Sequence, residues 1–426
     1  MRAPPIRADD PWEGPHIVYP DRVSRNGAAH DGCNMNLGGS VGKGSARNQP
    51  CWCGSGKKYK VCHLRRESQP PPTLQRGVEL LRQRRADRVC LHPQAGPSAC
   101  VGKIVNAHSV SRAAGLKRIA EAGKVVGFRH GPDADRSGHY FRSMSTKTAS
   151  TFTGFCQWHD KQLFAPLEDD VLEPTPEQVA LLGFRSTARE LYQKRGVLSE
   201  YEDSHDMDRG LTPPQQAMFQ ATLAARTEAL MSGIRLLESL YERYAKRVDT
   251  GQFADIEFLL LEFDIEPVVL NSSQWHVEFD CRGNLLQDLS RLWVPFESVS
   301  LEFLVTSDQR QACLLSWIGA SRTSRRLAQS LLQLSDRELP SAVMRLLVLA
   351  SENCFFRPSW WEAIGGERRR LVNSHFGAGA ERTARELMAF FCDHSVRMCD
   401  WPLAHREVSG SWHEGASPGP TAANTG

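Results

Sequence analysis

The 426-residue sequence lacks several features that would assign it to a class of protein at once. It contains no apolar run near the roughly 20 residues that a membrane-spanning helix requires. Its first residues carry no apolar core and are not typical of a secretory signal. It has no internal repeat, and the glycine-rich run at 38–43 lacks the strand and helix that flank a phosphate-binding loop. We therefore expect a cytoplasmic protein with no membrane segment.

A disulfide-stabilised secreted protein is not favoured either, although the sequence contains 12 cysteines. In a chain of this length without a secretory signal, reduced thiols and metal ligands are the expected states of cysteine. Hydrophobic residues make up 41% of the sequence and charged residues 24%, so the chain can bury an ordinary globular core. Its length leaves room for two or three domains.

The net charge of +3 conceals an uneven distribution. Residues 41–120 contain 16 lysines and arginines against three acidic residues, a net charge of +13 that leaves about −10 for the rest. Such a basic block favours a polyanionic partner, and nucleic acid is the most common one. The alternative is a solvated helix face, because Arg82, Arg84, Arg85 and Arg88 would suit any exposed helix.

Four side chains that are typical zinc ligands lie within 13 residues of one another, in the pattern Cys-x-Cys-x8-Cys-His: Cys51, Cys53, Cys62 and His63. The segment is too short and too polar to form an apolar core. A tetrahedral Zn2+ site would supply the free energy that folds it. Free thiols and an imidazole in a loop are the alternative.

Nearly every position of this segment resembles the SEC-C motif, a small zinc module known from the tail of the bacterial preprotein translocase ATPase. The resemblance covers about residues 47–65 and implies a structural zinc site. It also suggests a protein partner that binds through the module.

A second group of candidate zinc ligands is dispersed more widely: Cys90, Cys100, Cys156 and His159. A loose cysteine pair followed by Cys-x-x-His at the start of a helix is the ligand layout of a treble clef. The interval from Cys90 to Cys100 is long for a zinc knuckle, so His92 is an alternative ligand. Buried cysteines without a metal are the alternative to a site.

Between the two halves lies Ala107-His108-Ser109, and the succession resembles the HNH, or His-Me finger, endonucleases. The segments 107–126 and 149–164 are similar to uncharacterised bacterial proteins that join a SEC-C motif to such a treble clef. The resemblance implies that His108 is a general base and that Asp160 binds a catalytic Mg2+ or Mn2+. In the HNH family an asparagine lies on the strand before the last pair of zinc ligands, and here residues 151–153 take its place. The alternative to a catalytic role for His108 is a purely structural one.

Hydrophobic periodicity predicts an α+β, multidomain protein. We expect strands at 103–108, 124–128, 150–155, 256–263, 275–279 and 298–305, a helix or turn at 113–122, a turn at 283–284, and helices across 175–246 and 323–396, the last interrupted at 353–361. The predicted segments are a disordered N-terminus at 1–46, with Met35 as an alternative start, the SEC-C module at 47–66, a Pro-rich spacer and basic helix at 67–89, the treble-clef ββα domain at 90–170, a mixed helical and strand-rich domain at 171–405, and a disordered tail at 406–426.

Two functions fit these patterns. The first is a metal-dependent DNA or RNA endonuclease with two structural zinc ions, for which defence against foreign nucleic acid is one setting. The second is a non-catalytic zinc adapter that binds protein or nucleic acid. Two weaker metal sites are a polar loop with His130, Asp133, Asp135 and His139, and the group Cys392, His394 and Cys399.

Overall fold

The computed structural model describes residues 46–83, 88–128, 141–168, 173–291, 294–376, 383–393, 395–410 and 412. The predicted disordered segment before Ala46, the alternative start at Met35 and the polar loop with His130 and His139 lie outside these residues. No helix among the described residues is long and apolar enough to cross a membrane.

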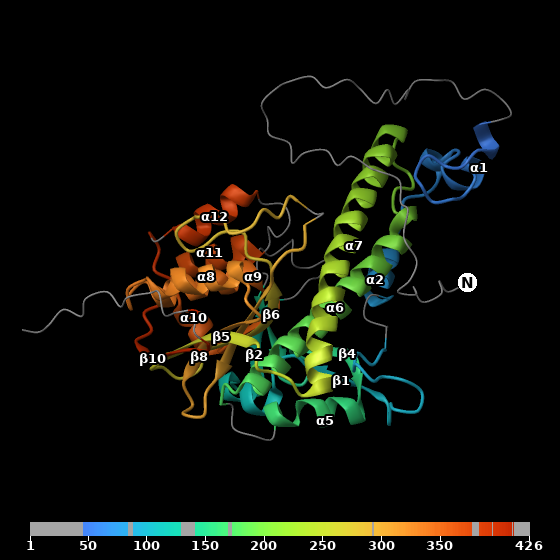
Figure 1. Ribbon diagram of the computed structural model, residues 1–426. Helices are drawn as coiled ribbons and strands as arrows, with labels where there is room; N and C mark the ends of the chain where they lie inside the picture. The colour runs from blue at the N-terminus through green and yellow to red at the C-terminus, as the bar shows by residue number, and fades with distance from the viewer. Residues whose placement is uncertain are drawn as a thin grey trace, which may run out of the picture. The chain divides into compact units, whose positions relative to one another are not determined.

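One antiparallel sheet of eight strands organises most of the chain (Figure 1). Its spatial order is β10 (Leu403–Val408), β5 (Ile256–Phe263), β8 (Gln311–Ile318), β7 (Val299–Val305), β6 (Val269–Trp275), β9 (Cys354–Phe356), β2 (Lys124–Phe128) and β3 (Phe141–Ser145). The α+β class is therefore confirmed.

Helices cover both faces of this sheet, so its central strands are apolar on both sides. On β5, Leu259, Leu261 and Phe263 join one core, which is completed by five helices, α8 (Arg322–Leu332), α9 (Leu339–Ala350), α10 (Pro358–Ala363), α11 (Gly366–Phe376) and α12 (Ala384–Cys392). The alternate residues Phe258 and Leu260 join a second core with α5 (Gln157–Glu168), α6 (Pro176–Asp203) and α7 (Pro213–Thr250). The period of two along a strand sends these neighbours to opposite faces.

The two long helices α6 and α7 form a hairpin through the connection at 204–212, which contains the 3-10 turn η4 (Ser204–Asp206). The Thr175 hydroxyl accepts a hydrogen bond from the Gln178 amide, and Pro176 occupies the first turn, so α6 begins at a strong start signal. The helices approach closely at Gly183, where an added Cβ would lie 2.3 Å from the Tyr244 hydroxyl.

A smaller unit of two strands and a helix carries the predicted treble-clef residues. β1 (Ile104–His108) pairs antiparallel with β4 (Thr151–Cys156), and α5 follows β4 without a connecting loop. The intervening residues 109–150 contain β2 and β3, which belong to the large sheet. The domain boundary at 170 stays a prediction, although strands on both sides of it share that sheet.

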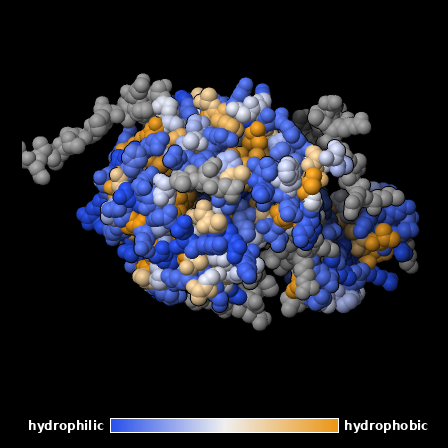
Figure 2. All heavy atoms as spheres, turned by 90° about the horizontal axis from the view of Figure 1, so that it is seen from below, coloured by the Kyte–Doolittle hydropathy of each residue, from blue (hydrophilic) through white to orange (hydrophobic). Residues whose placement is uncertain are grey.

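The remaining elements are short. Near the N-terminus they are η1 (Ala46–Asn48), α1 (Tyr59–Cys62), η2 (Arg66–Ser68) and α2 (Leu74–Gln83). The helix or turn predicted at 113–122 is present as η3 (Arg112–Leu116) and α3 (Lys117–Ile119), and α10 (Pro358–Ala363) follows β9. The face shown in Figure 2 is mostly hydrophilic, with apolar residues scattered over it.

Most of the predicted strands are present, but two predicted boundaries are wrong. The strand expected at 275–279 lies earlier, because β6 ends at Trp275 and only Phe279 forms an isolated bridge beyond it. The start predicted for the disordered tail, residue 406, is also too early, because β10 continues to Val408 and Trp412 is buried in the first core. Both segments gain their structure from pairing and packing with strands distant in the sequence.

Candidate metal centres

The first centre is built by a short hairpin and one turn of helix. A bridge between Pro50 and Lys58 closes the hairpin that carries Cys51 and Cys53. Gly54 and Gly56 have positive φ angles of 75° and 69°, which suit glycine and let the chain turn back within a few residues. The helix α1 then presents Cys62 and His63 at its end.

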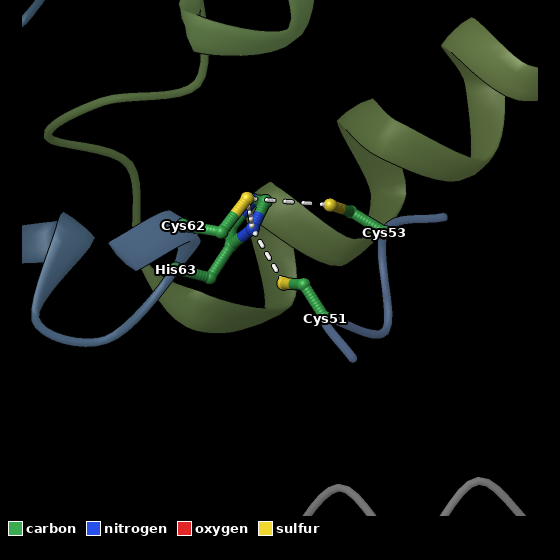
Figure 3. A group of neighbouring side chains, drawn as sticks. All are labelled: Cys51, Cys53, Cys62 and His63. Atoms are coloured by element: carbon green, nitrogen blue, oxygen red, sulfur yellow. Dashed lines mark hydrogen bonds between the residues drawn. The ribbon is translucent and has the colours of Figure 1, made fainter. Parts of the chain in front are cut away.

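The four donor atoms of these residues lie within 4.8 Å of one another (Figure 3). His63 Nδ1 is 3.1 Å from Cys51 Sγ and 3.3 Å from Cys62 Sγ, and the sulfurs of Cys53 and Cys62 are 3.5 Å apart. In a tetrahedral site with Zn–S bonds of about 2.3 Å, neighbouring sulfurs are about 3.8 Å apart. The donor set and its spacing therefore fit a structural zinc ion.

Two features of the environment bear on this cluster. Burial raises the pKa of Cys51 to about 12, so a cation is needed to keep this thiol ionised. The Ser55 hydroxyl lies 3.2 Å from Cys53 Sγ and 3.3 Å from Cys62 Sγ, within hydrogen-bonding distance of both sulfurs.

Residues 47–65 match the family model of the SEC-C motif. This segment is a SEC-C motif. No curated protein and no solved structure gives a significant match to the chain. The SEC-C motif and its Cys3His cluster are therefore shown, while the match covers a small part of the chain.

The second centre collects its ligands from distant positions. Cys90 and Cys100 precede β1, Cys156 ends β4, and His159 lies in the first turn of α5. His159 Nδ1 is 3.3 Å from Cys90 Sγ, 3.7 Å from Cys100 Sγ and 3.3 Å from Cys156 Sγ. These donors also lie within 4.8 Å of one another and are consistent with a second zinc site.

The alternative ligand His92 lies beside this cluster and is not one of its four gathered donors. Its ring stacks on that of His159, with centroids 3.9 Å apart and an interplanar angle of 4°. Burial lowers the pKa of His92 to about 4, so the ring is neutral at physiological pH. His92 packs against the site from outside.

The predicted catalytic residues lie on the same two-strand and helix unit. His108 ends β1, and its Nε2 is 3.2 Å from the Thr146 carbonyl oxygen, so this nitrogen carries the hydrogen and Nδ1 is the free acceptor. Burial lowers the pKa of His108, which keeps the ring neutral. Burial also raises the pKa of Asp160 to about 6, against the opposing charge of Arg185.

Two charged residues that the sequence did not indicate join this region. Glu168, at the end of α5, accepts hydrogen bonds from the Ser111 hydroxyl at 2.6 Å and from Arg185 Nη1 at 2.8 Å. The charges of Glu168 and Arg185 act on both His108 and Asp160. No local pattern marks Glu168 or Arg185, because each is one of many charged residues on a long helical stretch.

Within the described ranges, the only gathered groups of three or more candidate metal donors are the two Cys3His clusters. His108 and Asp160 do not form a third. Cys392 and Cys399 also stay outside such a group, and His394 lies outside the described residues.

A cavity of about 1010 Å³ adjoins the two-strand unit. It is lined by residues of β1, β4, α6 and β6, among them Asn106, Thr151, Lys194 and Trp275. Lys194 and Trp275 place a cation and an aromatic ring in this cavity, beside the strand that ends in His108.

Proposed function

We propose that this chain is a zinc-containing, nucleic-acid-binding protein that cleaves phosphodiester bonds with its β1–β4–α5 unit. The observation that carries the proposal is the position of His108. It stands at the end of β1, opposite β4, on a unit whose helix begins at a Cys3His cluster. This is the arrangement expected of an HNH-like nuclease.

The chemistry assigned to His108 is that of a general base. The Thr146 carbonyl holds its Nε2 hydrogen, which leaves Nδ1 to accept a proton from a water molecule. Its lowered pKa keeps the accepting form populated at neutral pH. Arg185 and Glu168 would help to orient groups around it.

Asp160, in the first turn of α5, is the oxygen donor that would hold Mg2+ or Mn2+. Mg2+ is commonly bound by one or two protein carboxylates together with phosphate oxygens of the substrate. A single carboxylate such as Asp160 is compatible with this pattern, because phosphate oxygens and water would complete the coordination. A bound cation would stabilise the negative charge of the reacting phosphate.

Exposed cations support a nucleic-acid partner. In the SEC-C motif Lys57, Lys58 and Lys60 are exposed, whereas Arg66 of the same basic block is buried in an ion pair with Asp208. The cavity beside β1 adds Lys194 and Trp275, which suit phosphate contact and base stacking.

The test is cleavage of plasmid DNA and of structured RNA by the full chain with Mg2+ or Mn2+. We expect His108→Ala to abolish cleavage while the zinc content is unchanged. His405→Ala, an exposed position on β10, is the matched control and should cleave as the wild type does. Inactivity of the zinc-loaded wild type on both nucleic acids with both cations would refute the nuclease.

The second candidate, a non-catalytic adapter, is favoured by apolar exposure at the zinc clusters. Trp52 and Val61 are 50% and 68% exposed beside the first cluster, and Trp158 is 50% exposed beside the second. A chain that neither cleaves nor binds nucleic acid, and whose Trp52→Ala variant loses a protein partner, would establish the adapter.

A further inference from the structure

The SEC-C motif makes a buried contact with a residue 145 positions away. Asp208 lies in the connection between α6 and α7 and is 0% exposed. Its Oδ2 is 2.9 Å from His63 Nε2 and accepts a hydrogen bond from Gln220 Nε2 at 2.7 Å, and its Oδ1 forms an ion pair with Arg66 Nε at 2.6 Å.

These contacts define the tautomer of the metal-binding histidine. His63 Nδ1 faces the sulfurs of Cys51 and Cys62, so it is the nitrogen available to a metal. Nε2 then carries the hydrogen and donates it to the carboxylate of Asp208. A histidine ligand that donates its second ring hydrogen to a carboxylate is oriented by it and becomes a stronger donor.

We infer that Asp208 is the carboxylate that orients the zinc ligand His63. Zinc binding thereby holds the SEC-C motif against the α6–α7 connection. Asp208 is a positioning residue, because it acts on the metal through His63. The inference requires zinc at the SEC-C motif and is independent of nuclease activity.

Arg66 offsets the negative charges of the zinc centre and of Asp208. Three thiolates and one Zn2+ leave a net charge of about −1 on a Cys3His centre. Arg66 Nη1 is 3.8 Å from Cys62 Sγ and 3.3 Å from the Cys62 carbonyl oxygen, while its Nε pairs with Asp208. One guanidinium thus lies between two negative groups, so the buried carboxylate does not repel the thiolates.

A backbone contact joins the same two segments. The Gly210 amide donates a hydrogen bond to the Arg66 carbonyl oxygen at 3.1 Å. Gly210 has a φ angle of +80°, and an added Cβ would lie 3.1 Å from the Gln69 carbonyl oxygen. The connection is therefore shaped to fit against the end of the SEC-C motif.

The second cluster provides a comparison within the same chain. Its histidine, His159, stacks on His92, and among the described residues its ring hydrogen-bonds to the three cysteine sulfurs through Nδ1 and to no carboxylate. The loss of Asp208 should therefore weaken the first site and spare the second.

The test compares Asp208→Asn with Asp206→Asn, a neighbouring acid that pairs with Arg76 and Arg209 near the surface. The full zinc-loaded chain is challenged with a chromophoric chelator, and thiol alkylation is followed by mass spectrometry at each cysteine. We expect zinc affinity at the SEC-C motif to fall about 10- to 100-fold in Asp208→Asn.

The cysteines of the SEC-C motif should then be alkylated faster, while those of the second cluster keep their wild-type rate. Asp206→Asn should match the wild type throughout. Wild-type protection of the SEC-C cysteines in Asp208→Asn would overturn the inference.

A second measurement does not depend on a change at Asp208. Cys53→Ser removes a zinc ligand whose side-chain hydrogen bonds, within the described residues, go to Ser55 and Cys62 of the SEC-C motif itself. Hydrogen exchange of the 204–212 peptide, which contains the Gly210 amide, should be faster in this variant than in the wild type. Unchanged exchange would show that zinc does not clamp the connection, whatever the behaviour of the Asp208 variants.

Discussion

Glu302 is the group for which the structure makes the sharpest prediction about stability. It lies on β7 and is 2% exposed, and its carboxyl group hydrogen-bonds to Ser186 of α6. Its Oε1 accepts hydrogen bonds from the hydroxyls of Ser272 and Ser300, each at 3.2 Å. Burial raises the pKa of Glu302 well above its ordinary value, against the opposing charge of Arg185. Folding therefore favours the neutral acid form of this side chain over the carboxylate.

A raised pKa in the folded state makes stability depend on pH in a defined direction. In the unfolded chain a glutamate ionises with a pKa of about 4.3. The favourable contribution of the neutral acid is complete below that value and is lost as pH rises toward the folded pKa. The loss amounts to at most about 1.4 kcal/mol per pH unit. Glutamine has nearly the same shape and cannot ionise, so Glu302→Gln removes this dependence.

The assay is urea unfolding of wild type and Glu302→Gln at a series of pH values, followed by tryptophan fluorescence. We expect the variant to gain stability relative to the wild type as the pH rises above about 4.3, by up to about 1.4 kcal/mol per unit, until the pH reaches the folded pKa of Glu302. Glu242→Gln, at an exposed position of α7, is the control and should follow the wild type. Parallel pH profiles for wild type and Glu302→Gln would refute the reasoning.

Three further predictions follow from the fold and the clusters. Elemental analysis of freshly purified protein should find about two zinc ions per chain, and a value near zero would contradict both Cys3His sites. Gly183→Ala should lower the free energy of unfolding by about 1–3 kcal/mol, because its Cβ would meet the Tyr244 hydroxyl, and Tyr244→Phe should restore part of the loss in denaturant titrations. Replacing the exposed Lys57 and Lys60 by glutamate should weaken nucleic-acid binding and flatten its salt dependence in fluorescence anisotropy, and an affinity that does not fall with added salt would exclude phosphate contact.

The sequence by itself was enough for features that depend on neighbouring residues. The SEC-C ligands lie within 13 residues, so hairpin and helix geometry alone bring Cys51, Cys53, Cys62 and His63 together. The strands at 256–263 and 298–305 were also predictable, because short segments dominated by apolar residues are typical of buried strands. These signals do not require knowledge of the partner strand.

Tertiary structure decided everything that joins distant segments. Asp208 reaches His63 across 145 residues, and nothing in its local sequence distinguishes it from Asp206, the other acid of the α6–α7 connection. The sequence likewise could not reveal that β2 and β3 enter the large sheet, or that Glu168 and Arg185 act on His108. The physical reason is that burial and pairing are properties of the packed chain, and they change the chemistry of a side chain without changing its local pattern.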